Sequence, residues 1–189
     1  MSNNYLANPL ILLLEVGLGL YIMTFMLRYL LAMIHADFYN PVSQFLVKVT
    51  DPLLVPARRF IPSFGKIDSA SIVIMLSLQI LMIFLVYSLR GTAPSIIGIV
   101  IRSIADLLEL FLNIFLYSIL IQVIISWINP GNYNPVTSLL SSLTEPLLRP
   151  ARQLIKPIGG MDLSPMAVMI SITIVKMLLL PPLYMLAGI

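Results

Sequence analysis

The sequence predicts an all-α membrane protein with four transmembrane helices in two parallel tandem repeats, each with an amphipathic cytoplasmic helical hairpin. Three observations lead to this fold class: the composition, four long apolar runs and a repeated segment. Of the 189 residues, 59% are hydrophobic and only 10% are charged, whereas soluble domains carry about 25% charged residues. So few charges cannot cover a soluble enzyme or a nucleic-acid-binding domain. We therefore expect a single membrane domain over residues 1–189 and no direct contact with nucleic acid.

Four apolar runs are long enough to cross a membrane, because a hydrocarbon core of about 30 Å needs about 20 helical residues. No Lys or Arg precedes the first run, so we expect no cleaved signal peptide and count this run as a span. We interpret a shorter apolar stretch, Pro94 to Ile101, as an interfacial lead-in to the third span. The predicted spans cover about 10–34, 72–89, 104–128 and 166–186.

A tandem duplication organises the chain. Shifted by 94 residues, the sequence aligns with itself without a gap, and TDPLLVPAR at 50–58 matches TEPLLRPAR at 144–152. Repeat 1 is 10–89, the connector is 90–103 and repeat 2 is 104–189. Each repeat crosses the membrane twice, so both copies have the same orientation, related by an axis along the membrane normal. This arrangement weakens a transporter interpretation, because inverted repeats are more familiar in secondary transporters.

The segment between the two spans of each repeat predicts two short amphipathic helices. Asn-Pro pairs at Asn40 and Asn134 are typical of a helix start, with Asn at the N-cap and Pro in the first turn. Asp-Pro at Asp51 and Glu-Pro at Glu145 predict the start of a second helix. The predicted helix caps are Asn40, Asp51, Asp68, Asn134, Glu145 and Asp162. The predicted apolar faces of the first copy hold Val42, Phe45, Leu46 and Val49, then Leu53, Leu54, Ala57, Phe60 and Ile61.

Basic residues concentrate in these two segments, which the positive-inside rule places in the cytoplasm, so both termini are predicted to be periplasmic. Their arginines would meet anionic lipid headgroups at the interface. The segments could instead only seal the ends of the spans, dock a membrane or cytoplasmic protein, or re-enter the membrane as a pore lining. The candidate lipid or partner surface comprises Arg58, Arg59, Arg149 and Arg152, and the other basic residues of the segments are Lys48, Lys66 and Lys156.

The doubled motif N-P-V-[ST]…T-[DE]-P-L-L-x-P-A-R…I…G-x-x-D resembles the YggT family, called YlmG in Gram-positive bacteria and plastids. The two-repeat proteobacterial form is the nearest match, although Gln153 stands where the first copy has Arg59. The resemblance implies a multi-pass protein of the bacterial inner (cytoplasmic) membrane. It also implies a link to osmotic upshift and potassium handling, and it brings no catalytic residues.

Three ionisable residues form the candidate intramembrane polar site: Glu15, Glu109 and Lys176. Charges within a membrane are functional candidates by default. Glu15 and Glu109 occupy equivalent repeat positions and could form a cation or proton site on the pseudo-two-fold axis. Structural pairing is the alternative, with Lys176 bound to Glu15 or Glu109, or reaching outward to the interface. Arg28 could likewise reach the interface, or pair with Asp51 or Asp68.

No phosphate loop, nucleophile elbow or metal-ligand cluster occurs in the sequence. A single histidine, His35, cannot supply both axial ligands of a haem in a monomer. We therefore expect no enzyme activity, no cofactor and no metal. The favoured function is a non-enzymatic membrane organising or assembly factor bearing on osmotic-stress tolerance. The alternative is a small ion channel or transporter affecting potassium or proton balance, and a homo-oligomer is compatible with both functions.

Overall fold

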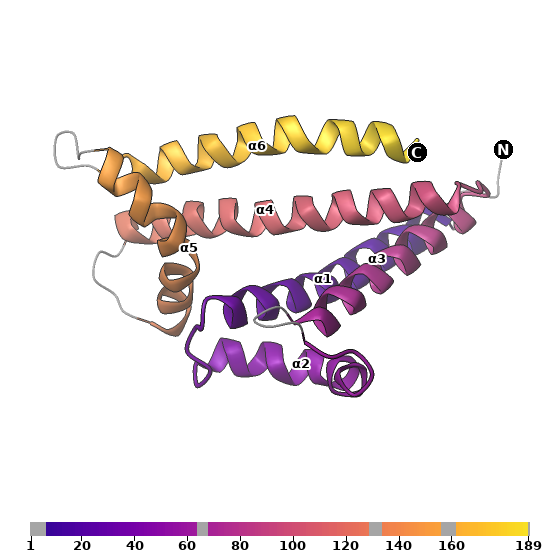
Figure 1. Cartoon of the computed structure of the whole chain (residues 1–189), viewed down its shortest axis with the longest axis horizontal. Helices are drawn as coiled ribbons and strands as arrows, with labels where there is room; N and C mark the ends of the chain where they lie inside the picture. The colour runs from indigo at the N-terminus through magenta and orange to yellow at the C-terminus, as the bar shows by residue number, and fades with distance from the viewer. Residues whose placement is uncertain (1–6, 64–67, 129–133, 156–161, 189) are drawn as a thin grey trace.

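The computed structural model describes residues 7–63, 68–128, 134–155 and 162–188 (Figure 1). Among these residues every regular element is an α-helix, which confirms the all-helical prediction. Lys66 and Lys156, two of the predicted basic residues, lie outside the described residues. The helices are α1 Ala7–Met33, α2 Pro41–Arg58, α3 Ser69–Leu89, α4 Ile96–Ile128, α5 Pro135–Leu154 and α6 Ser164–Ala187.

Four of these helices, α1, α3, α4 and α6, are long and apolar enough to cross a membrane. In the most apolar stretch of each helix, no more than 22% of the residues are buried inside the molecule. The remaining surface is rich in exposed aliphatic side chains, such as Leu13 and Leu178. In water, exposed aliphatic surface along four helices would cause the protein to associate. In a bilayer the same surface faces hydrocarbon. The chain is therefore a membrane protein with four candidate transmembrane helices.

The third span begins earlier than its predicted start at residue 104. Residues 96–101 are helical and continuous with the span, so the stretch predicted to lead into the span is its first part. The 33 residues of α4 extend about 50 Å at about 1.5 Å per residue, well beyond a hydrocarbon core of about 30 Å. Gly98 holds the start of α4 against α6, because a Cβ there would lie 2.5 Å from the carbonyl oxygen of Ala187.

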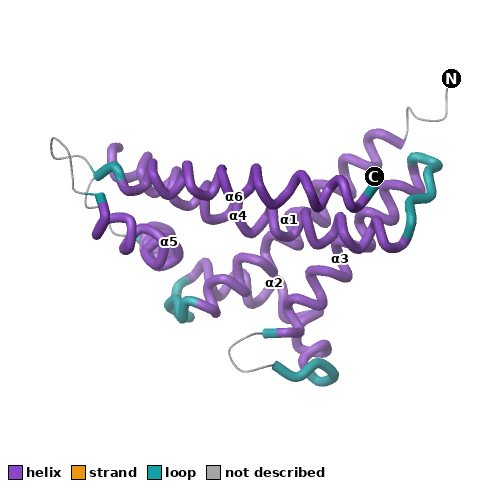
Figure 2. The backbone as a smooth tube through the Cα atoms, turned by 45° about the horizontal axis from the view of Figure 1, so that its top comes forward, coloured by secondary structure: helices purple, strands orange, loops and turns teal. Residues whose placement is uncertain are grey.

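The spans form two antiparallel pairs, α1 with α3 and α4 with α6. The start of α1, the end of α6 and the α3–α4 connector all lie at one end of the molecule (Figure 1). The pairs converge at that end, where α3 packs on α4, and they diverge towards the other end. Figure 2 shows α2 and α5 at the divergent end from a second angle. We call α2 and α5 together the platform. The two repeats run in the same direction, as the even number of crossings predicts.

The predicted helical hairpins are wrong, because α2 and α5 are each one continuous helix with two prolines inside. Asp51 and Glu145 therefore lie in helix interiors and cap nothing. A proline removes one backbone hydrogen bond and kinks the helix, and Figure 1 shows α2 turning along its length. The helices continue through the prolines because Leu54 and Leu148, which lie between the two interior prolines of each helix, are at most 1% exposed in the core.

All six helices contribute to one apolar core where the two pairs and the platform meet. Its centre holds Phe25 of α1, Leu54 of α2, Ile119 of α4 and Leu148 of α5, each at most 1% exposed. The platform helices also contact each other directly, since the Asn40 side-chain amide donates to the carbonyl of Pro135 at 2.7 Å. Packing at the platform therefore joins the repeats at the end where their spans diverge.

The apolar faces of the platform helices differ from the predicted ones. Phe45 and Phe60 of the predicted apolar faces are 60% and 84% exposed and do not pack in the core. Ser43 and Thr50 are buried instead, together with Leu46 and Leu54 on the same side of α2. The side of α2 that packs against the core is thus rotated relative to the predicted apolar face, and this rotation leaves Phe45 exposed.

Candidate functional site

A group of polar side chains links α1, α3, α4 and α6 between the middle of the spans and the end that carries the termini. We call this group the polar network. Sequence inspection identified Glu15, Glu109 and Lys176, and the structure adds residues that the apolar runs hide. The polar network comprises Glu15, Gln79, Arg90, Arg102, Asp106, Glu109, Asn113, Lys176 and Tyr184.

Lys176 lies midway along α6, about 18 Å from Ser164 at about 1.5 Å per residue. A charge near the centre of a bilayer costs at least about 2.5 kcal/mol when it is not compensated. The Lys176 ammonium lies 3.2 Å from a carboxylate oxygen of Glu109 and donates to Asn113 Oδ1 at 2.5 Å. Of the two predicted partners of this lysine, the structure selects Glu109.

Tyr184 connects α6 to two carboxylates on α4. Asp106 and Glu109 are three residues apart and therefore share one helix face. The Tyr184 hydroxyl lies 2.9 Å from Asp106 and 2.8 Å from Glu109. It has one proton to donate, so it can serve only one of them at a time. Gln79 of α3 donates to Asp106 at 3.0 Å, which ties a third span into the polar network.

Every carboxylate of the polar network faces a cation. Asp106 lies 3.6 Å from Arg102, and Glu15 lies 3.8 Å from Arg90. Glu15 and Glu109 therefore belong to different ion pairs and do not form the paired carboxylate site that their equivalent positions suggested. A cavity of about 130 Å³ lies between the two outer pairs. Its lining residues are Glu15, Met82, Ile83, Val86, Tyr87, Arg90, Arg102 and Asp106.

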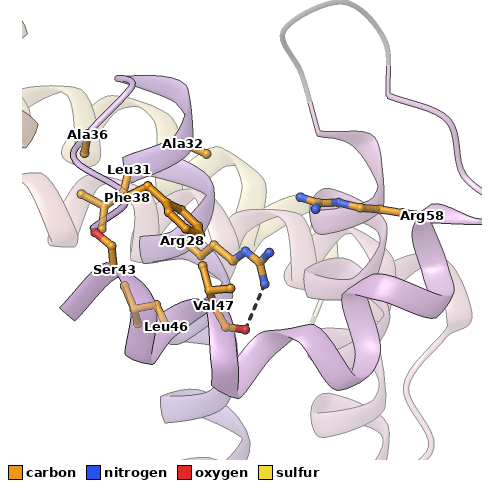
Figure 3. A pocket seen from close by; sticks show the side chains of 9 residues that line it. All are labelled: Arg28, Leu31, Ala32, Ala36, Phe38, Ser43, Leu46, Val47 and Arg58. Atoms are coloured by element: carbon orange, nitrogen blue, oxygen red, sulfur yellow. Dashed lines mark hydrogen bonds between the residues drawn. The ribbon is translucent and has the colours of Figure 1, made fainter. Parts of the chain in front are cut away.

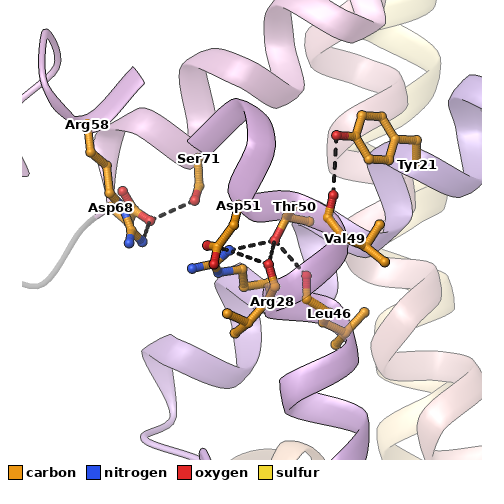
Figure 4. A network of polar contacts seen from close by, with 10 residues as sticks. Tyr21, Arg28, Leu46, Val49, Thr50, Asp51, Arg58, Asp68 and Ser71 are labelled. Carbon is orange, nitrogen blue, oxygen red and sulfur yellow. Dashed lines mark hydrogen bonds and ion pairs between the residues drawn. The ribbon is translucent and has the colours of Figure 1, made fainter. Parts of the chain in front are cut away.

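The repeated motif builds the same ion pair twice at the platform. Arg58 lies 2.6 Å from Asp68, and Arg152 lies 3.0 Å from both Asp162 and Glu145. The Arg58–Asp68 pair (Figure 4) and the Arg152–Asp162 pair each join the end of a platform helix to the start of the next span. Burial raises the pKa of Asp68, but hydrogen bonds from Arg58 and Ser71 outweigh it, so this pKa lies below its ordinary value. The pKa of Asp162 is lowered in the same way, with burial opposed by Ser164 and Arg152.

A second repeated contact joins the first span of each repeat to the threonine of its own platform helix. Arg28 Nη1 donates to the Thr50 hydroxyl at 2.6 Å and lies 2.7 Å from Asp51, as Figure 4 shows. In the second copy the Thr144 hydroxyl donates to Gln122, the residue at the position of Arg28. Asp51 therefore accepts from a span arginine rather than from a helix N-terminus.

The remaining predicted caps occupy helix starts with different geometry. The Asn40 side chain accepts from the backbone N–H of Val42, and Asn134 forms a capping box with Thr137. Asp162 accepts from the N–H of Ser164 at 2.9 Å. Asp68 is at the N-cap of α3, but its carboxylate accepts from the Ser71 hydroxyl rather than from a backbone N–H.

The four arginines of the predicted surface divide into two pairs. Arg58 and Arg152 are held by the aspartates described above. Arg59 and Arg149 are exposed, and in the described part of the chain neither forms an ion pair. Only Arg59 and Arg149 therefore lack a counter-ion among the described residues, while Arg58 meets Asp68 through Nη2 alone. Within the described ranges, no three His, Cys, Asp or Glu residues are grouped so that they could hold a metal ion.

A model of the CCB3/YggT family matches residues 7–89 and 101–183. The chain belongs to the CCB3/YggT family. The two matched segments correspond to the two repeats, so the family resemblance read from the doubled motif is confirmed. Within each segment the family model covers two spans and one platform helix.

Relatives with the same two-repeat length occur in bacteria. An uncharacterised protein of Pseudomonas aeruginosa is 40% identical over 172 residues, which cover 90% of this chain and 87% of the relative. The uncharacterised protein YggT of Escherichia coli is 36% identical over 170 residues, covering 90% and 88%. The uncharacterised protein ycf19 of Porphyra purpurea is 35% identical over 77 residues, which cover 40% of this chain and 77% of that protein. No solved structure matches the chain.

Asn113, Gln79 and Tyr184 were not predicted from the sequence, and each is a polar side chain within an apolar run. Asn113 follows Glu109 by four residues and so lies on the same face of α4. Gln79 is the one side-chain amide in a charge-free span, and Tyr184 follows a pair of prolines near the end of α6. Polar side chains at helical spacing within apolar runs could have suggested such a group, but not which helices it connects.

Proposed function

We propose that the protein is a non-enzymatic membrane organising or assembly factor that supports growth after osmotic upshift. The observation that carries this proposal is the platform. Its two helices are tied to each other, to both repeats and to the spans, and their outer side is covered by no other described part of the chain. That side presents Phe45 of α2, Phe60 just after α2 and Leu154 of α5, which are at least 60% exposed.

The surface chemistry of the platform suits a membrane interface and a partner located there. Exposed aromatic and aliphatic side chains bury themselves at the boundary between headgroups and acyl chains. Arg59 and Arg149 lack ion-pair partners among the described residues, so each can contribute about 1 kcal/mol of attraction to anionic lipid or to an acidic partner surface. The polar network, by contrast, has each of its carboxylates beside a cation, which suits an internal tie between spans.

The test reverses the two free charges and leaves the paired ones in place. Arg59→Glu combined with Arg149→Glu should insert at wild-type abundance but fail to restore growth of a deletion strain after osmotic upshift. The matched control, Arg59→Lys with Arg149→Lys, keeps the charge and should restore growth. Growth of the double Glu variant at the wild-type rate would contradict the proposal.

A second candidate function is a small ion channel or transporter, and the cavity between the outer ion pairs favours it. Glu15, Arg90, Arg102 and Asp106 give this cavity a charged lining beside three of the spans. Potassium or proton flux into liposomes that contain the purified protein would support this function. Glu15→Gln with Glu109→Gln should then abolish the flux, whereas the organising function predicts no flux from either protein.

A further inference from the structure

A second cavity, of about 220 Å³, lies where α1 turns into α2. Its walls are mainly apolar, and two arginines reach into the same side of it. Figure 3 shows the Arg28 and Arg58 side chains extending towards one another from α1 and α2. The lining residues are Arg28, Leu31, Ala32, Ala36, Phe38, Ser43, Leu46, Val47 and Arg58.

The Arg28 guanidinium keeps unused donors at this cavity. Its contacts to Val47, Thr50 and Asp51 all involve Nη1. A guanidinium carries five N–H donors over three nitrogens, so the Nε and Nη2 donors have no partner among the described residues. Arginine at such a position binds phosphate oxygens with paired, charge-assisted hydrogen bonds.

Ser43 provides an independent observation at the same cavity. The residue is 8% exposed, and its hydroxyl oxygen is buried without a hydrogen-bond partner among the described residues. A buried hydroxyl without a partner destabilises the protein relative to one that is hydrogen-bonded. The cavity wall therefore contains a polar atom that would be satisfied by a ligand with an acceptor oxygen, such as an ester carbonyl.

The size and position of the cavity indicate what occupies it. Sites that enclose a whole small molecule measure about 300–1,000 Å³, so this cavity holds only part of a ligand. Arg28 lies about 30 Å along α1 from Ala7 at about 1.5 Å per residue, which is the thickness of the hydrocarbon core. The arginines are thus at headgroup depth, while the apolar walls adjoin the acyl chains.

We infer that this cavity binds one anionic phospholipid. Its phosphate lies between Arg28 and Arg58, an ester carbonyl accepts from Ser43, and one acyl chain enters between Leu31 and Leu46. The remainder of the lipid stays in the bilayer. The inference is independent of the function proposed above, because it concerns a lipid held by the protein rather than a partner on the outside of the platform.

The second repeat provides the natural comparison. Gln122 stands at the position of Arg28, and Ser126 and Ser141 stand at the positions of Ala32 and Val47. These substitutions remove the cation and make the walls polar. The lipid site therefore belongs to the first repeat, although the Arg58–Asp68 pair recurs in the second as Arg152–Asp162.

Native mass spectrometry of the purified protein with phosphatidylglycerol tests the inference, with phosphatidylcholine of the same chains as the neutral-headgroup comparison. The wild type should retain a single phosphatidylglycerol per chain and bind phosphatidylcholine less tightly. Arg28→Gln, which copies the second repeat, should weaken phosphatidylglycerol binding about ten-fold, since a charge-assisted contact is worth about 1.4 kcal/mol or more. Arg152→Gln is the matched control and should leave binding unchanged.

A second variant keeps the test decisive if Arg28→Gln does not fold. Ala32→Phe fills the cavity and retains both arginines, so it should lose phosphatidylglycerol to the same extent. Unchanged lipid retention in Ala32→Phe would overturn the inference, as would equal losses in Arg28→Gln and Arg152→Gln. Displacement of the lipid by sn-glycerol 3-phosphate alone would also overturn it, since that result describes a free-phosphate site.

Discussion

Arg28 and Gln122 occupy the same position in the two repeats, and each side chain meets the threonine of its own platform helix. Both contacts join a span to a platform threonine, but the span residue is charged in the first repeat and neutral in the second. Arg28 needs a counter-ion, and Asp51 supplies it at 2.7 Å. In the second repeat, Gln122 is neutral, and Glu145 at the position of Asp51 pairs with Arg152 instead. The ion pairs of the two platform helices thus differ where Gln122 replaces Arg28 and Glu145 replaces Asp51.

At this scale the Lys176–Glu109 pair gives the first prediction. Lys176→Met should lower the free energy of unfolding by about 2 kcal/mol, because Glu109 then keeps its charge without a cation. The value lies below that of fully buried pairs, because the Glu109 side chain is 38% exposed. Adding Glu109→Gln should recover part of the loss. Thermal unfolding in detergent measures both effects, and a double variant no more stable than Lys176→Met would show that the two charges do not interact.

The aspartates of the repeated motif give a prediction about acid. The pKa of Asp68 and that of Asp162 are lowered below 3.8 in the folded protein. A carboxyl with a lowered pKa stabilises the fold above its unfolded pKa, and this contribution disappears as the pH falls through the folded pKa. We therefore expect the temperature midpoint of unfolding to decrease as the pH is lowered from about 5 to about 3.

Asp68→Asn with Asp162→Asn should lower the midpoint at neutral pH and flatten its acid dependence in that range. Asp37→Asn is the control, because Asp37 is exposed and forms no ion pair among the described residues. If the thermal midpoint of the double Asn variant falls with pH as steeply as that of the wild type, carboxyl groups other than Asp68 and Asp162 cause the fall.

At the scale of helices, the bends in the platform helices and the close approach of α4 to α6 determine the arrangement more than helix propensity does. Two prolines inside α2 and two inside α5 remove backbone hydrogen bonds, yet both helices continue. Burial of Leu54 and Leu148, which lie between the two prolines of each helix, stabilises the continuation. Between α4 and α6 the decisive residue is small. Gly98 lets the first turn of α4 lie against the last turn of α6, in the manner of small residues at membrane helix interfaces.

Gly98→Leu should therefore separate these two helix ends and lower the thermal midpoint in detergent. Any side chain at this position meets the carbonyl oxygen of Ala187 at 2.5 Å and the Ser95 hydroxyl at 2.9 Å. Gly17→Leu is the matched control, since a Cβ on Gly17 has no atom within 4 Å. Equal midpoints for the two variants would show that the close approach does not contribute to stability.

The whole molecule has two unlike ends. At one end the termini, the α3–α4 connector and the outer part of the polar network come together, and at the other the platform fills the space between diverging spans (Figure 1). Two parallel repeats produce this polarity directly, because equivalent elements are placed on the same side of the membrane. The free arginines Arg59 and Arg149 are then both on the platform side.

The orientation of these ends in the membrane is open to a direct test. The positive-inside rule predicts the platform in the cytoplasm and the connector in the periplasm. The chain has no cysteine, so single substitutions can be labelled without background. Ser63→Cys, next to α2, should resist a membrane-impermeant thiol reagent in intact cells, whereas Thr92→Cys in the connector should react. The reverse pattern would place the platform outside.

Some features depend only on nearby residues, and the sequence alone determined them. Hydrophobic runs identify the four candidate spans because crossing a membrane is a matter of length and polarity along one helix. The doubled motif identifies the repeats and the family, and the Asn-Pro pairs at Asn40 and Asn134 coincide with two helix starts. The helix break expected at Asp51 was wrong, because the rule for prolines omits the core packing that lets α2 continue.

Which distant groups meet was decided only by the tertiary structure. Lys176 had two candidate partners, and the packing of α6 on α4 brings it to Glu109 rather than to Glu15. Gln79 and Tyr184 join the polar network through the rotation of α3 and α6 about their axes, which no pattern along one helix specifies. The cavity beside Arg28 likewise depends on the angle between α1 and α2. Distances between helices follow from how their side chains interlock, so they are absent from any single segment of the sequence.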